Sequence, residues 1–196
     1  MAGIASGLIA VVLIGVLVAS HFGARTGAAA RVSSSPSTAD AGPITWFAGD
    51  QFKCARTEAF GLGPAPQIAH VKAVGAATNI GYDRFTIQFA DGQPAQSDLL
   101  IQDSARFTEV PGGGSVVLKG EAGALLTLHA TDGHASFKGP SELKTEYPVV
   151  LEMRRVQDFG GTVQWAVGLS RTACYRVGFV SSPASLVIDF RLRQAA

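Results

Sequence analysis

Three neighbouring runs decide the fold: GGTVQWAVGLS at 160–170, YRVGF at 175–179 and SLVIDF at 185–190. Apolar side chains recur at every second position, which is typical of a strand with one buried face. In the first run this face carries Val163, Trp165, Val167 and Leu169. Because the connections between the runs are short, they predict antiparallel neighbours. The chain therefore ends in an all-β domain.

Six more strand-like runs precede these three, at residues 68–74, 84–89, 99–101, 115–119, 125–130 and 149–154. The second is the clearest, because Phe85, Ile87 and Phe89 share one face. Asp-Gly pairs and the glycine run at 112–114 mark turns between the strands. About eight or nine strands at this spacing predict an antiparallel β-sandwich over residues 67–196. We expect Trp165, Phe85 and Ile87 to share its core.

The N-terminal segment is apolar, and residues 4–19 contain no charged side chain. We expect residues 1–20 to form a hydrophobic helix, either an uncleaved transmembrane anchor or a cleaved signal segment. Cleavage sites with small residues lie at 18–20 and at 28–30. No cysteine precedes Cys54, so we expect no lipid attachment at a signal-peptide cysteine. Either alternative takes the rest of the chain out of the cytoplasm.

Residues 21–66 are expected to form a flexible linker and an irregular lead-in, since Ala, Ser, Thr, Gly and Pro dominate the first half. Two arginines, Arg25 and Arg31, favour a cytoplasmic position for this flank by the positive-inside rule. Cysteine usage favours the opposite orientation, and we follow it. The formal net charge is +1 and no basic run occurs, which argues against a nucleic-acid partner.

The residue patterns predict no catalytic residues, metal or cofactor. None of the four histidines, His21, His70, His129 and His134, has metal-ligand spacing to another His or Cys. Ser170 lacks the second glycine and the following helix of a nucleophile elbow. The glycine run at 112–114 lacks the Lys-Ser/Thr and the helix of a phosphate-binding loop, so it predicts a hairpin.

Three segments in this order resemble the AMIN-like domain: GYDRFTIQF at 81–89, WAVGL at 165–169 and LVIDF at 186–190. The resemblance extends over roughly residues 70–191. It implies a small bacterial protein that is secreted or anchored to the membrane by a lipid or a helix. The related AMIN domain is a β-sandwich attached to cell-wall amidases and secretins, which it directs to the envelope through peptidoglycan.

The candidate binding residues are Tyr82, Arg84, Trp165 and Asp189. Arg84 and Asp189 can pair across neighbouring strands, as an orienting pair or as part of a ligand site. If Trp165 were exposed instead of buried, its ring would be a platform for a sugar. In an exported protein, two separated cysteines favour a Cys54–Cys174 disulfide, with two buried free thiols as the alternative.

These features together predict an extracytoplasmic, membrane-tethered, non-catalytic binding domain of the bacterial cell envelope. The expected partner is a cell-wall glycan, that of peptidoglycan, or an envelope protein. One alternative is a structural partner domain of an envelope complex. The other is a small cell-wall hydrolase whose site is assembled from residues 131–146.

Overall fold

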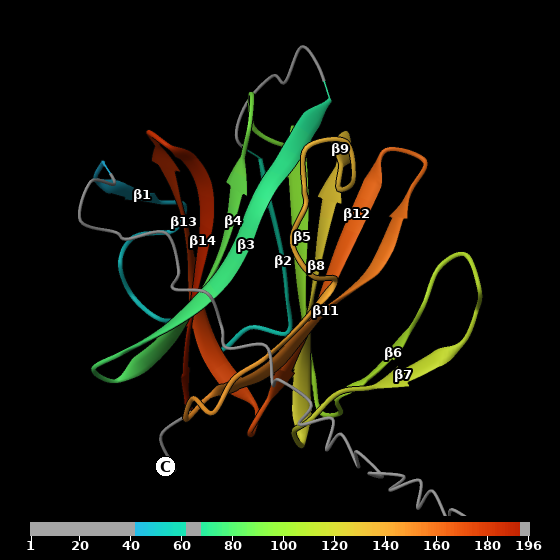
Figure 1. Ribbon diagram of the computed structural model, residues 1–196. Coiled ribbons are helices and arrows are strands. Elements are labelled where there is room, and N and C mark those ends of the chain that lie inside the picture. The colour runs from blue at the N-terminus through green and yellow to red at the C-terminus, as the bar shows by residue number, and fades with distance from the viewer. Residues whose placement is uncertain (1–41, 62–67, 193–196) are drawn as a thin grey trace, which may run out of the picture. The chain divides into compact units, whose positions relative to one another are not determined.

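A computed structural model describes residues 42–61 and 68–192 of the chain (Figure 1). The regular elements of these residues are β-strands, as the sequence predicts. None of the described residues belongs to a helix that could cross a membrane. The predicted anchor at residues 1–20 and the linker at residues 21–41 lie outside the described residues.

Two six-stranded sheets form the two layers of the domain. Sheet 1 has the order β1 (Ile44–Trp46), β13 (Ala173–Ser181), β14 (Ala184–Leu192), β4 (Tyr82–Phe89), β3 (Ala69–Asn79), β9 (Thr131–Asp132). Sheet 2 has the order β10 (Glu142–Lys144), β11 (Val150–Phe159), β12 (Thr162–Leu169), β8 (Ala122–His129), β5 (Gln96–Gln102), β2 (Thr57–Gly61). A separate hairpin, β6 (Arg106–Thr108) and β7 (Ser115–Val117), projects at the right of Figure 1.

All nine strands expected from the sequence are present, but the expected total of eight or nine is too low. The additional strands β1, β2, β6, β9 and β10 have five residues or fewer. A strand this short has too few positions to establish a period of two. The glycine run at 112–114 lies in the turn of the β6–β7 hairpin, as predicted.

The expectation that the three C-terminal runs are consecutive neighbours is wrong for the first pair. Strands β13 and β14 pair antiparallel, but β12 belongs to sheet 2 and β13 to sheet 1. The short connection at residues 170–172 therefore crosses from one sheet to the other. Alternation indicates which face of a strand is buried, but it does not indicate whether the next strand lies beside it or opposite it.

The core lies between the two sheets, and Trp165 is its largest buried side chain. The Trp165 ring has no exposed surface, and it contacts Phe85 with the ring centroids 6.3 Å apart. Ile87 belongs to the same cluster of buried residues. The prediction that these three side chains share one core is confirmed, so Trp165 is not available as a sugar platform.

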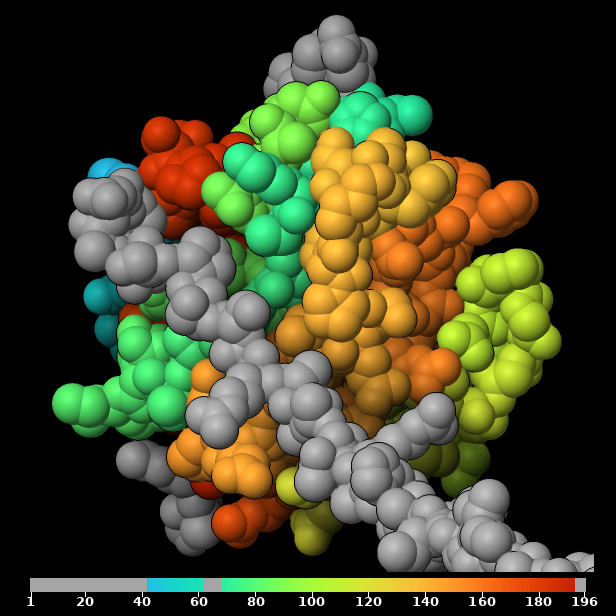
Figure 2. Space-filling view, viewed as in Figure 1, coloured from blue at the N-terminus to red at the C-terminus, as the bar shows by residue number. Residues whose placement is uncertain are grey.

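The segment between β9 and β10 covers one side of the sandwich. It is yellow-orange in Figure 2, where it runs between β3 and the orange strands of sheet 2. Strand β9 pairs parallel with β3, and β10 pairs antiparallel with β11. Phe137 of this segment packs edge-on against Trp165, with 6.0 Å between centroids. The segment between β9 and β10 therefore closes one side of the hydrophobic core.

The lead-in is more regular than the sequence indicates, because residues 42–61 contribute an outer strand to each sheet. The folded region thus begins before the expected boundary at residue 67. Phe47 and Phe60 stack with centroids 5.2 Å apart, and Phe47 packs on the main core. The Cys54–Cys174 disulfide, predicted from the cysteine count, joins this segment to the first residues of β13.

Next to the disulfide, Tyr175 is a fully buried side chain. Its backbone N–H and C=O bond to Lys53 at 2.8 Å each, and Lys53 forms an ion pair with Glu58. Burial raises the pKa of the Tyr175 hydroxyl, and the negative charge of Glu58 raises this pKa further. A neutral phenol is therefore favoured in the folded state.

This raised pKa predicts a loss of stability at alkaline pH. The unfolded chain releases the Tyr175 proton near the ordinary tyrosine pKa of about 10, whereas the folded chain retains it. The free energy of unfolding should therefore fall as the pH rises above about 10. We expect a shallower fall in Tyr175→Phe than in the wild type, measured as urea midpoints between about pH 8 and 11. Tyr147→Phe, which retains Tyr175, is the control, and equal slopes in all three proteins would contradict the assignment.

Candidate functional site

Three of the four candidate binding residues meet on the outer face of sheet 1. Asp189 of β14 lies between Arg84 of β4 and Arg176 of β13 in the strand register. The Asp189 carboxylate has no exposed surface and accepts hydrogen bonds from Arg84 Nε at 2.7 Å and Arg176 Nε at 2.9 Å. The predicted cross-strand pair of Arg84 and Asp189 is confirmed. Arg176 is a second arginine that pairs with the same carboxylate.

The environment of Arg84 keeps its guanidinium charged. Burial opposes the charge, but the hydrogen bonds and the attraction to Asp189 outweigh burial, so the pKa of Arg84 is raised. Removing only one partner of a buried ion pair costs far more stability than removing both, because it leaves an unpaired buried charge. Arg84 and Asp189 are therefore expected to hold each other in place.

Aromatic rings from the lead-in cover these arginines. The Arg176 guanidinium carbon lies 4.2 Å from the ring centroid of Trp46 and 4.6 Å from that of Phe52. Tyr82 faces Arg176 at 5.1 Å, and Arg191 lies over Phe52 at 4.3 Å. We call this set the arginine–aromatic cluster: Trp46, Phe52, Tyr82, Arg84, Arg176, Asp189, Arg191. The contacts of Trp46 and Phe52 with the arginines hold the lead-in against sheet 1.

The sequence contained a signal for Arg176 but not for the aromatic rings. With Ser181 and Ala184 closing the β13–β14 hairpin, counting backwards places Arg176 opposite Asp189. Trp46 and Phe52 precede the regular pattern, so no register could have been counted for them. Gly178 is also required here, since a Cβ atom would lie 2.7 Å from the Trp46 ring.

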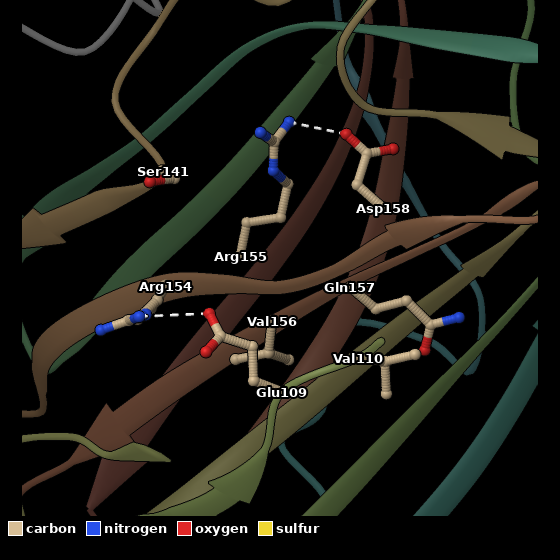
Figure 3. Close-up of a pocket in the computed structure, with 8 residues that line it drawn as sticks. All are labelled: Glu109, Val110, Ser141, Arg154, Arg155, Val156, Gln157 and Asp158. Carbon is tan, nitrogen blue, oxygen red and sulfur yellow. Dashed lines mark hydrogen bonds and ion pairs between the residues drawn. The ribbon is translucent and has the colours of Figure 1, made fainter. Parts of the chain in front are cut away.

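A polar pocket of about 280 Å³ opens on sheet 2 (Figure 3). Three separate parts of the chain line it: Glu109 and Val110 after β6, Ser141 before β10, and residues 154–158 of β11. Backbone hydrogen bonds join these parts, from Val110 N to Val156 O and from Arg155 N to Ser141 O, both at 2.8 Å. A register shift in β11 between Arg155 and Gln157 changes the direction of the side chains there.

A small second apolar cluster supports this pocket from below. Val156, which is 1% exposed, packs with Phe107 of the β6–β7 hairpin and Ala166 of β12. Because this cluster attaches the hairpin to the outer face of sheet 2, it sets the distance between Glu109 and β11.

The charged groups of the pocket are paired. Arg154 Nη2 lies 3.1 Å from Glu109 Oε1, and Arg155 Nη1 lies 2.9 Å from Asp158 Oδ2. Figure 3 shows these two pairs pointing in different directions from β11. Within residues 42–61 and 68–192, the side chains of Ser141 and Gln157 form no hydrogen bond. The pocket thus presents a free hydroxyl and a free amide between neutralised charge pairs.

A carboxylate–histidine network continues from Asp158. The ligand-type atoms of Asp132, His134 and Asp158 lie within 4.8 Å of one another, a grouping that the sequence spacing did not reveal. The N–H of Ala135 is the main cause of a lowered Asp132 pKa, and the N–H of His134 adds to it. Asp158 Oδ2 lies 3.2 Å from His134 Nδ1 and also contacts the Arg155 guanidinium. Because Arg155 already supplies a positive charge there, we assign the network a structural role and no metal.

The second histidine at this turn has a different partner. His129, which flanks the same turn as His134, pairs with Asp98, with 2.7 Å between Nε2 and Oδ2. Gly133 between them is sterically required, because its Cβ would lie 2.8 Å from an Asp158 carboxylate oxygen. This turn is therefore built around Asp158.

The described region is a β-sandwich with one disulfide. Disulfide-containing domains of this kind are typical of proteins outside the cytoplasm. The family model of the AMIN-like domain matches residues 69–192, so the chain belongs to the AMIN-like domain family, as its motifs suggested. No curated protein and no solved structure matches the chain.

Proposed function

We propose that the chain is a non-catalytic binding domain in the bacterial cell envelope, held at the membrane by residues 1–20. Its ligand is the glycan of the cell wall, in peptidoglycan, bound at the polar pocket. Membership of the AMIN-like family and the disulfide both support a position outside the cytoplasm. A linker rich in small and polar residues supplies the reach between membrane and wall.

The free polar groups in the pocket are the observation that supports this ligand class most strongly. Sugars present many hydroxyl groups and no charge, so they require donors and acceptors in fixed positions. Ser141 and Gln157 offer such groups without internal competition. Arg154 and Arg155 are oriented by carboxylates, and a guanidinium has five N–H donors, more than these partners use.

The size of the pocket also favours one sugar residue. Its volume of about 280 Å³ is just below the ~300–1,000 Å³ range of ligand pockets. The pocket is open to solvent, so a long glycan can extend beyond it. Many weak contacts along one polymer then give useful affinity through multivalency.

The arrangement of carboxylates supports binding rather than hydrolysis. Glycoside hydrolysis uses two carboxyl groups that face the bond to be cleaved. Glu109 and Asp158 are instead directed to two different arginines, Arg154 and Arg155 (Figure 3). Each carboxylate forms an ion pair with its own arginine, so the two groups do not share one target bond.

Co-sedimentation with purified peptidoglycan sacculi tests this function. We expect the purified chain to sediment with sacculi and to release no muropeptides into the supernatant. Because the formal net charge is +1, binding should weaken only modestly between low and high salt. Released muropeptides would support the hydrolase alternative. Failure to sediment at any salt would leave the structural partner domain as the remaining alternative.

A further inference from the structure

A second pocket, of about 320 Å³, lies beside the arginine–aromatic cluster and is lined by residues from both sheets. Its walls come from the β3–β4 hairpin, the start of β11 and the end of β14: Gly81, Tyr82, Pro148, Val149, Arg191, Leu192. Most of the exposed wall is apolar, and Tyr82 and Arg191 belong also to the cluster. We call it the Arg191 pocket.

Arg191 differs from the other two arginines of the arginine–aromatic cluster, because its charge has no carboxylate partner among the described residues. Arg84 and Arg176 share the buried carboxylate of Asp189. Within residues 42–61 and 68–192, no carboxylate forms an ion pair with Arg191. Its guanidinium carbon lies over the Phe52 ring, 4.3 Å from the ring centroid, and the residue is exposed. A stacked guanidinium keeps its N–H edge free for a planar anion.

The carboxylate of Asp83 in the pocket wall does not neutralise Arg191. Asp83 is 1% exposed, and its Oδ2 accepts hydrogen bonds from Val149 N at 2.6 Å and Val150 N at 2.9 Å. These bonds fix the start of β11 against β4 and so build the wall. The region thus contains three guanidinium groups and two buried carboxylates. The excess positive charge belongs to Arg191, which lines the pocket.

We propose that the Arg191 pocket binds the free carboxyl end of a short peptide with small apolar side chains. Arg191 pairs with the carboxylate, because a guanidinium fork matches its two oxygens. Pro148, Val149 and Leu192 contact the side chains, and Tyr82 and Asn79, which also line the pocket, supply polar groups for the peptide. The limited volume selects small residues.

This inference goes beyond the proposed glycan binding and does not depend on it. The two pockets have no lining residue in common. Loss of one activity therefore leaves the other testable in the same protein.

The test is an NMR titration of the full chain with N-acetyl-alanyl-alanine in both enantiomeric forms. Each form is compared with the same dipeptide ended by an amide. We expect the free acid to shift the resonances of residues around Arg191. The amide should bind more weakly than the acid by a factor of about ten or more. Arg191→Gln should reduce acid binding by a similar factor and leave amide binding unchanged. Arg171→Gln, which removes an exposed arginine elsewhere, is the control.

The comparison of two ligands keeps the test independent of protein stability. If Arg191→Gln lowers the melting temperature, the acid–amide difference in the wild type still decides the question. Equal binding of acid and amide, or full binding by Arg191→Gln, would overturn the proposal. So would absence of binding by both enantiomers. Binding to vesicles of anionic lipid in place of the peptide would assign the pocket to a membrane surface instead.

Discussion

Replacing Trp165 by alanine is expected to lower the free energy of unfolding by about 3–5 kcal/mol. The ring has no exposed surface and contacts both Phe85 from sheet 1 and Phe137 from the covering segment. Its removal leaves a cavity where three parts of the chain meet. A loss of this size is a large part of the stability of an ordinary domain.

Chemical denaturation followed by circular dichroism measures this effect. Trp46→Ala is the matched control, since Trp46 is only partly buried and lies on the outer face of sheet 1. We expect a clearly smaller loss for Trp46→Ala. A Trp165→Ala variant as stable as the wild type would show that the two sheets are not packed on this ring.

Removing the Cys54–Cys174 disulfide should destabilise the chain by about 4–5 kcal/mol in the chain-entropy model. The two cysteines are 120 residues apart, so the bond restricts a large loop of the unfolded chain. The native contacts of β1 and β2 do not require the bond, because both strands are paired within the sheets.

The double variant Cys54→Ala/Cys174→Ala, compared with the wild type under oxidising conditions, measures this difference. Reduced wild-type protein is the control and should match the variant. An equally stable variant, or labelling of two free thiols in the native protein, would contradict the assignment.

Long strands could be predicted from this sequence, but their division between two sheets could not. Phe85, Ile87 and Phe89 in β4 show the period of two over a full strand. Strand β1 has three residues, and its pairing with β13 depends on contacts far away in the sequence. The crossing at 170–172 is as short as a hairpin, so its length gave no indication of the change of sheet.

The candidate sites were predictable only where strand pairing alone creates them. Arg84 and Asp189 occupy paired positions, and a hairpin count reaches Arg176. The polar pocket instead needs Glu109, Ser141 and Gln157 to meet. The glycine run predicts the β6–β7 hairpin, but the packing of that hairpin on sheet 2 and the register shift in β11 have no signature in one sequence.

The most direct test of the account is sacculus binding by a variant of the polar pocket. Ser141→Ala/Gln157→Ala removes the two free polar groups and retains both ion pairs. We predict that this variant binds sacculi about tenfold more weakly than the wild type, since each lost hydrogen bond contributes about 0.5–1.5 kcal/mol. Gln88→Ala, a surface amide on sheet 1, should bind like the wild type. Unchanged binding by a folded Ser141→Ala/Gln157→Ala variant would contradict the assignment of glycan binding to this pocket.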